Sequence, residues 1–182
     1  VYRQNILSKT LPSMHRKAII TIFVLVSLTY FNALFNDFVG DDHVLIVENT
    51  FYKSWTNFPR LFQQGYNFNW ARDMVGGYLD RGPGSVSYRP VDNATYFVDF
   101  WLWGPKPFGY HLTSVLIHLA NVIMVYVLFN RLGLLFPAAM FGALLFGLHP
   151  VQSEAVCNIG YRADVLACFF ILGQTAKAEY SY

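Results

Sequence analysis

The sequence predicts an all-α membrane protein, a polytopic bundle of about four helices with one large loop on the non-cytoplasmic side. Of its 182 residues, 54% are hydrophobic and 13% are charged, and a soluble domain carries about twice that charged share. The mean hydropathy is +0.33. The apolar residues also gather in long runs rather than in amphipathic stripes. Together these observations favour a chain that folds in a bilayer.

Charge and cysteine content exclude several other classes. The net charge of +2, with no basic cluster interleaved with aromatics, does not indicate a nucleic-acid partner. Cys157 and Cys168 make no disulfide framework and have no zinc-site spacing. The chain also has no Walker loop and no GxGxxG, GxSxG or HExxH motif. Any chemistry must therefore come from a less standard set of residues.

The first predicted transmembrane helix covers residues 18–35, a stretch without a charged side chain. Its 18 residues are close to the minimum for a hydrocarbon core about 30 Å thick. His15, Arg16 and Lys17 precede it, and this positive flank places residues 1–17 in the cytoplasm. A secretory signal peptide is the alternative, but its apolar core would be shorter and a small-residue cleavage site would follow.

Residues 36–109 then form the large outer loop. Acidic and basic side chains alternate along it with many aromatics. Two stretches, 58–62 and 96–103, have the pattern of short amphipathic helices. Because Trp and Tyr prefer the membrane–water interface, we expect these helices to lie along it.

Two further apolar segments form a predicted helical hairpin. They cover residues 110–129 and 134–148, and the tight turn between them places Arg131 in the cytoplasm. Residues 149–164 are a second outer loop. Residues 165–182 begin a fourth span. Its apolar part ends near Ala176, before Lys177 and Glu179, and is too short to cross alone, so we expect the chain to be part of a longer protein.

The adjacent carboxylates Asp41 and Asp42 are the first candidates for chemistry. Charges near a bilayer are costly unless they are hydrated, paired or functional. Such a pair can hold a divalent cation, Mg²⁺ or Mn²⁺, through oxygen ligands. Alternatively, one carboxylate can accept a proton from an attacking hydroxyl. His43 follows directly as a supporting residue, and a solvated turn stays open as the structural alternative.

Arg89 is the second candidate. It stands between Tyr88 and Pro90, and the residue before a proline has a restricted backbone. The planar guanidinium suits a phosphate. The alternatives are a side chain that extends to the interface, or a partner for a loop aspartate.

Four ionisable residues lie where the second outer loop meets its helices. His149 and Glu154 follow the third apolar segment, and Arg162 and Asp164 open the fourth. They could complete a polar site with the first loop. Helix capping with an Arg162–Asp164 pair is the alternative.

His111 and His118 lie seven residues apart and so share one face of the second apolar helix. A metal site would need further ligands. Hydrogen bonding between helices is the favoured role for both.

Five segments in chain order resemble one known family. They are V-x-D-D-H within 38–43, Y-R-P within 87–90, P-x-G-x-H-L at 107–112 followed by His118, H-P-V-x-x-E-A-V at 149–156, and G-x-R-A-D at 160–164. These motifs resemble those of the transmembrane and tetratricopeptide-repeat proteins, which include protein O-mannosyltransferases and belong to the GT-C glycosyltransferases. The chain resembles the N-terminal portion of such a module, without the helical repeats.

The resemblance implies transfer of a sugar, mannose for example, from a polyprenyl- or dolichyl-phosphate donor to a protein or glycan acceptor outside the cytoplasm. Asp41 or Asp42 would be the acid–base or metal-associated carboxylate. Arg89 would hold the donor phosphate, with Arg162 as a second phosphate ligand. The location would be a bacterial inner membrane or the endoplasmic reticulum membrane.

Two other functions compete with this one. A non-catalytic membrane scaffold or lipid-contacting subunit would tolerate replacement of each polar loop residue. A transporter would carry charges within its spans, and residues 18–35 have none. The sequence does not decide which sugar is transferred, which acceptor receives it, or whether a metal is required.

Overall fold

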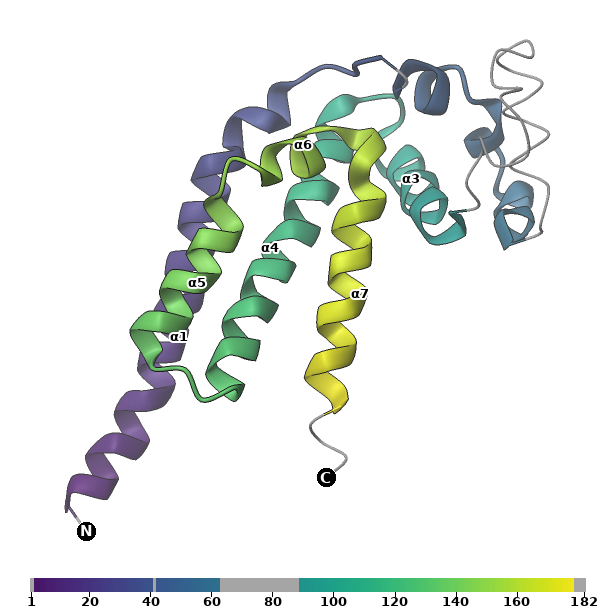
Figure 1. Ribbon diagram of the computed structural model, residues 1–182. Helices are drawn as coiled ribbons and strands as arrows, with labels where there is room; N and C mark the ends of the chain where they lie inside the picture. The colour runs from purple at the N-terminus through teal and green to yellow at the C-terminus, as the bar shows by residue number, and fades with distance from the viewer. Residues whose placement is uncertain (1, 41, 63–88, 179–182) are drawn as a thin grey trace.

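The computed structural model describes residues 2–40, 42–62 and 89–178, and within these ranges it contains helices and no strand. The all-α prediction is therefore confirmed. Four helices form the bundle: α1 (Tyr2–Tyr30), α4 (Pro107–Arg131), α5 (Phe136–Leu148) and α7 (Arg162–Ala178). Helix α4 contacts the other three (Figure 1).

The connections divide between the two ends of this bundle. The N-terminus, the α4–α5 turn and the C-terminal end of α7 lie at one end (Figure 1). The other end, named here the loop end, carries α3 (Pro90–Trp103) and α6 (Gln152–Cys157). The two predicted outer loops thus meet at one end of the molecule. That this end faces away from the cytoplasm stays a prediction.

Two segments, Ser13–Phe35 and Pro107–Arg131, are long and apolar enough to cross a membrane, each with a mean hydropathy of 2.1. Helix α5 has 13 residues, so at about 1.5 Å per residue it is shorter than a hydrocarbon core of about 30 Å. The third and fourth predicted spans therefore stay predictions. Helix α4 begins at Pro107, three residues before the predicted start, because proline suits the first helical position.

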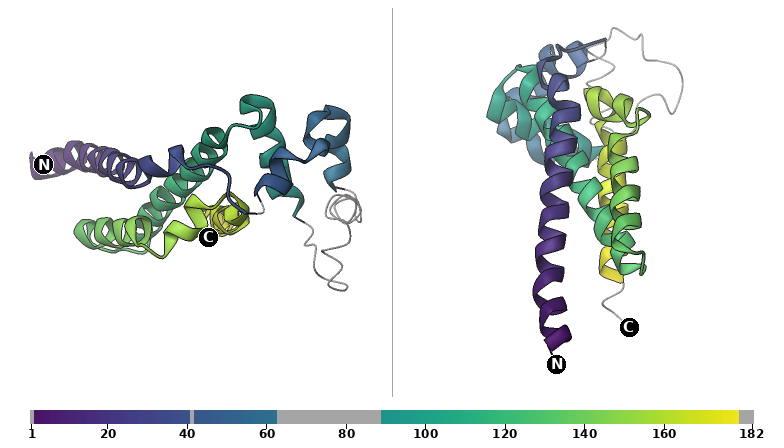
Figure 2. Two further views of the ribbon diagram at one scale, coloured as in Figure 1. Left: turned by 90° about the horizontal axis from the view of Figure 1, so that it is seen from above. Right: turned by 90° about the vertical axis from the view of Figure 1, so that its left-hand side faces the viewer.

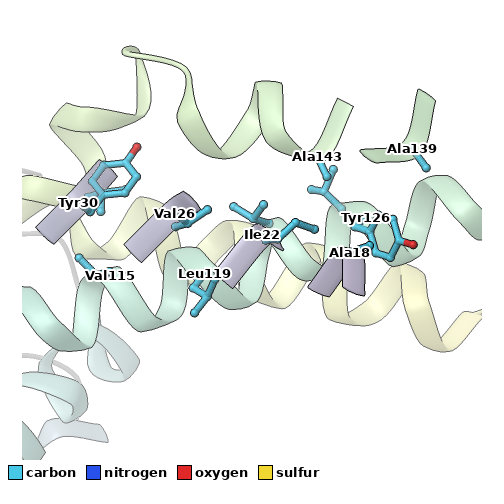
Figure 3. Close-up of a cluster of buried hydrophobic side chains, with 12 residues drawn as sticks. Ala18, Ile22, Val26, Tyr30, Val115, Leu119, Tyr126, Ala139 and Ala143 are labelled. Atoms are coloured by element: carbon cyan, nitrogen blue, oxygen red, sulfur yellow. The ribbon is translucent and has the colours of Figure 1, made fainter. Parts of the chain in front are cut away.

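An apolar seam holds α1 against α4 and α5. Buried residues recur every fourth position of α1, and they face small and branched side chains of the other two helices (Figure 3). The α1 members of this seam are Ala18, Ile22, Val26 and Tyr30. Large apolar side chains on the other faces of α1 stay exposed, among them Phe23 and Leu28. Such an exposed apolar surface suits contact with lipid or another chain.

A polar contact closes this seam at the loop end. Both the Tyr30 hydroxyl and Nε2 of His118 lie within hydrogen-bond distance of the Gly147 carbonyl oxygen, at 3.2 and 3.0 Å. The predicted role of His118 in hydrogen bonding between helices is confirmed. Gly147 also permits close approach, because a Cβ there would lie 2.7 Å from Cγ2 of Val122.

A second, aromatic core lies beneath α3. The η3 (Thr50–Lys53) and η4 (Trp55–Phe62) segments pack on α3, and Phe97 of α3 meets the rings of Phe51 and Tyr52 edge to face. The helices predicted at 58–62 and 96–103 are confirmed as parts of η4 and α3. These elements extend to one side of the bundle (Figure 2), and their position at a membrane interface stays a prediction.

Candidate active site

A polar pocket opens at the loop end, between the segment that follows α1 and helix α6. We name it the Asp42 pocket, and its volume is about 370 Å³. Six of its eight lining residues have a carboxylate, amide or hydroxyl side chain, and the full set is Asn36, Asp37, Val39, Asp42, Ser153, Glu154, Cys157 and Asn158. Hydroxyl groups of a sugar or a peptide would find many hydrogen-bond partners there.

A tight turn places the Asp42 carboxylate in this pocket. The Asp42 N–H donates to the Val39 carbonyl at 3.2 Å, and the Val39 N–H donates to Asp42 Oδ2 at 3.2 Å. Gly40 has a φ of 57°, a conformation that glycine adopts without strain. The side chain of Asp42 is 3% exposed, although it lines an open pocket. It is therefore a fixed, largely desolvated carboxylate beside a space for a reactant.

Segment 158–162 forms the other side of the Asp42 carboxylate. A Cβ at Gly160 would lie 3.7 Å from Asp42 Oδ1, so this glycine of the G-x-R-A-D motif packs beside the carboxylate. The Gly160 N–H donates to Asn158 Oδ1 at 3.0 Å, and Asn158 itself lines the pocket. Two motifs more than a hundred residues apart in the sequence thus meet at one carboxylate.

The other candidate site residues of the two outer loops differ in their position relative to the Asp42 pocket. Glu154 lines the Asp42 pocket. His43 is exposed and its ring packs against Phe38, with centroids 6.1 Å apart. His149 accepts the Val151 N–H through Nδ1 at 3.2 Å, which is a local contact beside α6. Asp41 and Tyr88 lie outside the described residues.

Arg89 lies on a different cavity, which we name the Arg89 groove. It has a volume of about 230 Å³ and lies between the start of α3 and one face of α7. Its lining residues are Arg89, Pro90, Val91, Asp92, Ala163, Leu166, Ala167 and Phe170. Arg89 does not share one polar site with Asp42, as the grouping of both outer loops predicts, because Asp42 and Arg89 line two separate cavities.

Arg162 lines neither cavity, because it is fully buried where α3, α4 and α7 meet. Its Nη1 pairs with Asp99 Oδ2 at 2.6 Å and donates to Thr95 Oγ1 at 3.0 Å. Its Nη2 donates to the Tyr110 carbonyl at 2.6 Å, and its Nε to Ser114 Oγ at 3.1 Å. The guanidinium carbon also lies 4.6 Å from the centroid of the Tyr96 ring.

Two expectations for Arg162 change as a result. Its partner is Asp99 and not Asp164, which is exposed in the first turn of α7. Its N–H groups point at acceptors within the protein, so the predicted role as a second phosphate ligand does not fit this environment. A buried guanidinium needs hydrogen-bond partners and a counter-charge to offset its desolvation, and here each of its three nitrogens has an acceptor.

Burial changes the acid–base properties of α3. It raises the pKa of Asp99, while the Arg162 guanidinium and the Thr113 hydroxyl oppose that rise. Burial likewise raises the pKa of Asp92 to about 6, with Arg162 and Arg89 acting in the opposite direction. Asp92 Oδ1 is buried and has no hydrogen-bond partner among the described residues. Part of the Asp92 population therefore carries a proton close to neutral pH.

Sequence reasoning missed this buried face of α3. Asp92, Tyr96 and Asp99 stand at positions i, i+4 and i+7, a spacing that places them on one side of a helix. This stripe of two aspartates and a tyrosine, flanked by apolar residues, is the sequence pattern that could have predicted the buried polar face of α3. Tyr96 continues the network, since its hydroxyl donates to the Ile159 carbonyl at 2.6 Å.

The described residues contain no group of three or more His, Cys, Asp or Glu side chains arranged to hold a metal ion. Because Asp41 lies outside them, a divalent cation at Asp41 and Asp42 stays a prediction.

Curated proteins of known name resemble the chain over most of its length. Protein O-mannosyl-transferase TMTC3 of Mus musculus is 33% identical over 156 residues, which cover 86% of this chain and 16% of the relative. Protein O-mannosyl-transferase F38B6.6 of Caenorhabditis elegans is 31% identical over 157 residues, 83% of the chain and 22% of the relative. TMTC1 of Mus musculus is 35% identical over 153 residues, 80% and 15% respectively.

The chain thus spans 15% to 22% of the length of these relatives. No protein-family model matches it. No solved structure matches it either.

Proposed function

We propose that this chain, which is homologous over most of its length to proteins named as TMTC protein O-mannosyl-transferases, forms part of a multi-pass membrane glycosyltransferase of the GT-C type. The enzyme would transfer a sugar, such as mannose, from a polyprenyl- or dolichyl-phosphate donor to a protein acceptor on the non-cytoplasmic side. The observation that carries the proposal is the buried Asp42 carboxylate on an open pocket lined by polar side chains.

Asp42 has the properties of a proton acceptor in this reaction. As the acceptor hydroxyl oxygen attacks the anomeric carbon, the bond from that carbon to the phosphate oxygen breaks and the electron pair leaves with the phosphate. The hydroxyl proton passes to the carboxylate, which must lie within about 3 Å of it. A carboxylate held by a turn and shielded from water needs little rearrangement to do this. Asp41 and a divalent cation would act beside it.

Arg89 would bind the phosphate of the donor. Its side chain is exposed at the mouth of the Arg89 groove, and a guanidinium fork matches phosphate oxygens. Because Arg89 and Asp42 line different cavities, we assign Arg89 to donor binding rather than to contact with the reacting carbon. Exposed apolar side chains on α1, α5 and α7 support a multi-pass location, from which a lipid-linked donor reaches the loop end.

The separation of Asp42 from Arg89 favours a second candidate, a non-catalytic subunit that contacts lipid. Such a subunit does not need the carboxylate and the guanidinium to share one cavity. The two functions differ in how they respond to loss of the carboxylate, since only the enzyme needs a proton acceptor in the Asp42 pocket.

The test is transfer in vitro from a radiolabelled polyprenyl-phosphate sugar to a peptide, with the complete protein purified in detergent. Asp42→Asn keeps the shape of the side chain and removes the base, so transfer should fall about a hundredfold or more. Glu48→Gln, at an exposed carboxylate that lines neither cavity, is the matched control and should leave transfer unchanged. Undiminished transfer by both Asp41→Asn and Asp42→Asn would remove the catalytic assignment and leave the lipid-contacting subunit.

A further inference from the structure

The segment that carries Asp42 lies across the start of α4. The η1 turn (Phe31–Phe35), which leads into this segment, packs on α4. Phe38 continues the contact, because its ring meets that of Tyr110 edge to face with centroids 5.5 Å apart. The next residue of the helix is His111. The first turns of α4 therefore support the segment from which the Asp42 pocket is built.

His111 is buried behind the wall of the Asp42 pocket. It is 1% exposed, and its imidazole lies beside the backbone of Asn36 and Asp37, two residues of the pocket lining. The Asp42 carboxylate lies close enough for its charge to act on the ring. His111 does not itself line the pocket, so any effect that it has on a bound molecule must pass through these neighbours.

Neither ring nitrogen of His111 has a hydrogen-bond partner among the described residues. The hydrogen bond between helices that its place on α4 predicts is therefore absent there. His118 differs, because its Nε2 lies 3.0 Å from the Gly147 carbonyl oxygen. A buried polar group without a partner destabilises a protein, and a leucine of similar size would avoid that cost. The cost is offset if the ring gains a partner while the site is at work.

We propose that His111 is a positioning residue for Asp42: when an acceptor occupies the pocket, a ring N–H donates a hydrogen bond to the Asp42 carboxylate. The proposal rests on the proposed function and adds the residue that orients its proton acceptor. A neutral imidazole has one N–H to donate, and it would join the Val39 N–H, which already binds Asp42 Oδ2. Two donors from different segments fix the direction of the base, as a third group does in other catalytic sites. Such hydrogen bonds often tighten only when the reactant binds, which accounts for the unpartnered ring nitrogens.

The test compares His111→Leu with His118→Leu in the complete protein, purified in detergent. Both histidines are 1% exposed and they lie seven residues apart on α4, so the two variants are matched in burial and helix position. His111→Leu should lower kcat for sugar transfer to a peptide about 10- to 100-fold, the usual loss for a residue that orients a reacting group. The KM for the peptide should stay within about twofold, because His111 does not contact the acceptor.

The stability of the two variants should show the opposite order. The midpoint of unfolding of His111→Leu in denaturing detergent should equal or exceed that of the wild type, because the lost nitrogens have no partner in the resting protein. His118→Leu loses its contact with Gly147, so its midpoint should fall while kcat per folded protein stays unchanged. A residue that served only packing would not separate kcat from stability in this way.

Two further comparisons identify the hydrogen bond itself. His111→Asn and His111→Gln place an amide N–H near the positions of Nδ1 and Nε2, and one of them should restore most of kcat. Because His111 acts only through the carboxylate, Asp42→Asn/His111→Leu should transfer sugar within about twofold of Asp42→Asn alone.

Four results would overturn the proposal. They are an unchanged kcat in His111→Leu, a loss of kcat that follows a fall in its unfolding midpoint, no recovery by either amide, and equal losses on the wild-type and Asp42→Asn backgrounds. If Asp42→Asn still slows transfer in any of these cases, the enzyme assignment stands without His111. If Asp42→Asn leaves transfer unchanged, the proposed function itself fails.

Discussion

The Arg162 guanidinium and the Asp99 carboxylate form an ion pair of 2.6 Å with exposed fractions of 0% and 2%. The pair joins the first residue of α7 to the C-terminal half of α3. It therefore sets the position of α3, which carries Asp92, against α7, which supplies the other wall of the Arg89 groove. It also anchors the segment that packs on Asp42.

Breaking this pair from one side should destabilise the protein strongly. Arg162→Met leaves the Asp99 carboxylate buried without its counter-charge, a situation that costs about 3–5 kcal/mol. Titration with a denaturing detergent, followed by circular dichroism, measures the loss of unfolding free energy. Lys53→Met, at an exposed cation of η3, is the control and should change it little.

A double variant that removes both charges separates the cost of the unpaired charge from the cost of lost packing. In Arg162→Met/Asp99→Leu no charge stays buried, and paired removal of this kind is often close to neutral. The double variant should regain most of the lost free energy. A double variant that is as unstable as Arg162→Met would show that packing and hydrogen bonds, rather than the stranded carboxylate, account for the loss.

Close packing of α4 against α5 gives a second prediction. In Gly147→Ala the new Cβ would lie 2.7 and 2.9 Å from the two Cγ atoms of Val122, and a valine has few rotamers with which to move away. We expect a loss of about 1–3 kcal/mol, as for other overpacked cores. Val122→Ala introduced into the same chain should restore part of it. Gly173→Ala, where a Cβ would meet no atom within 4 Å, is the control. Equal losses in the two glycine variants would contradict a specific clash.

The sequence carried the main features of the fold because they depend on local patterns. Long apolar runs predicted the helices, and Arg131 together with the positive N-terminal flank predicted that both loops meet at one end. The short amphipathic stretch at 96–103 predicted part of α3. Helix limits differed by a few residues, because Pro107 starts α4 earlier than hydropathy alone indicates.

The arrangement of the candidate site could not be predicted in this way, because it depends on contacts between residues far apart in the sequence. Arg162 was placed beside Asp164 because the two are close in sequence, but its partner Asp99 is 63 residues away. Asp42 and Arg89 both belong to segments predicted on the outer side, which favours a shared site, but three-dimensional packing sets them on separate cavities. Long-range pairing between α3 and α7 decides both outcomes.

Topology gives a third prediction. In a background of Cys157→Ala and Cys168→Ala, single cysteines at Ser153 and Leu132 test the two ends of the bundle, since both positions are exposed. An impermeant maleimide added to sealed vesicles with their cytoplasmic face outside should label Leu132→Cys. Ser153→Cys should react only after permeabilisation. Labelling of both from the same side would refute the arrangement in which the loop end faces away from the cytoplasm.

The fourth prediction concerns the pH dependence contributed by Asp92. Burial raises the pKa of this carboxyl from 3.8 to about 6 in the folded protein, whereas the unfolded chain keeps the ordinary value. Between these limits the folded state binds more protons than the unfolded state. Stability therefore decreases as the pH rises from about 4 to about 6, and above that range the penalty is constant. A rise of this size corresponds to at most about 3 kcal/mol.

Replacing Asp92 by asparagine removes the charge and keeps the shape of the side chain, so Asp92→Asn should be more stable than the wild type at pH 7.5 by up to about 3 kcal/mol and nearly equal to it at pH 4. The measurement is the unfolding free energy of both proteins in detergent at several pH values. Glu48→Gln, at an exposed carboxylate outside α3 and α7, should follow the wild-type curve throughout. A constant difference between Asp92→Asn and the wild type at every pH would mean that Asp92 titrates as it does in the unfolded chain.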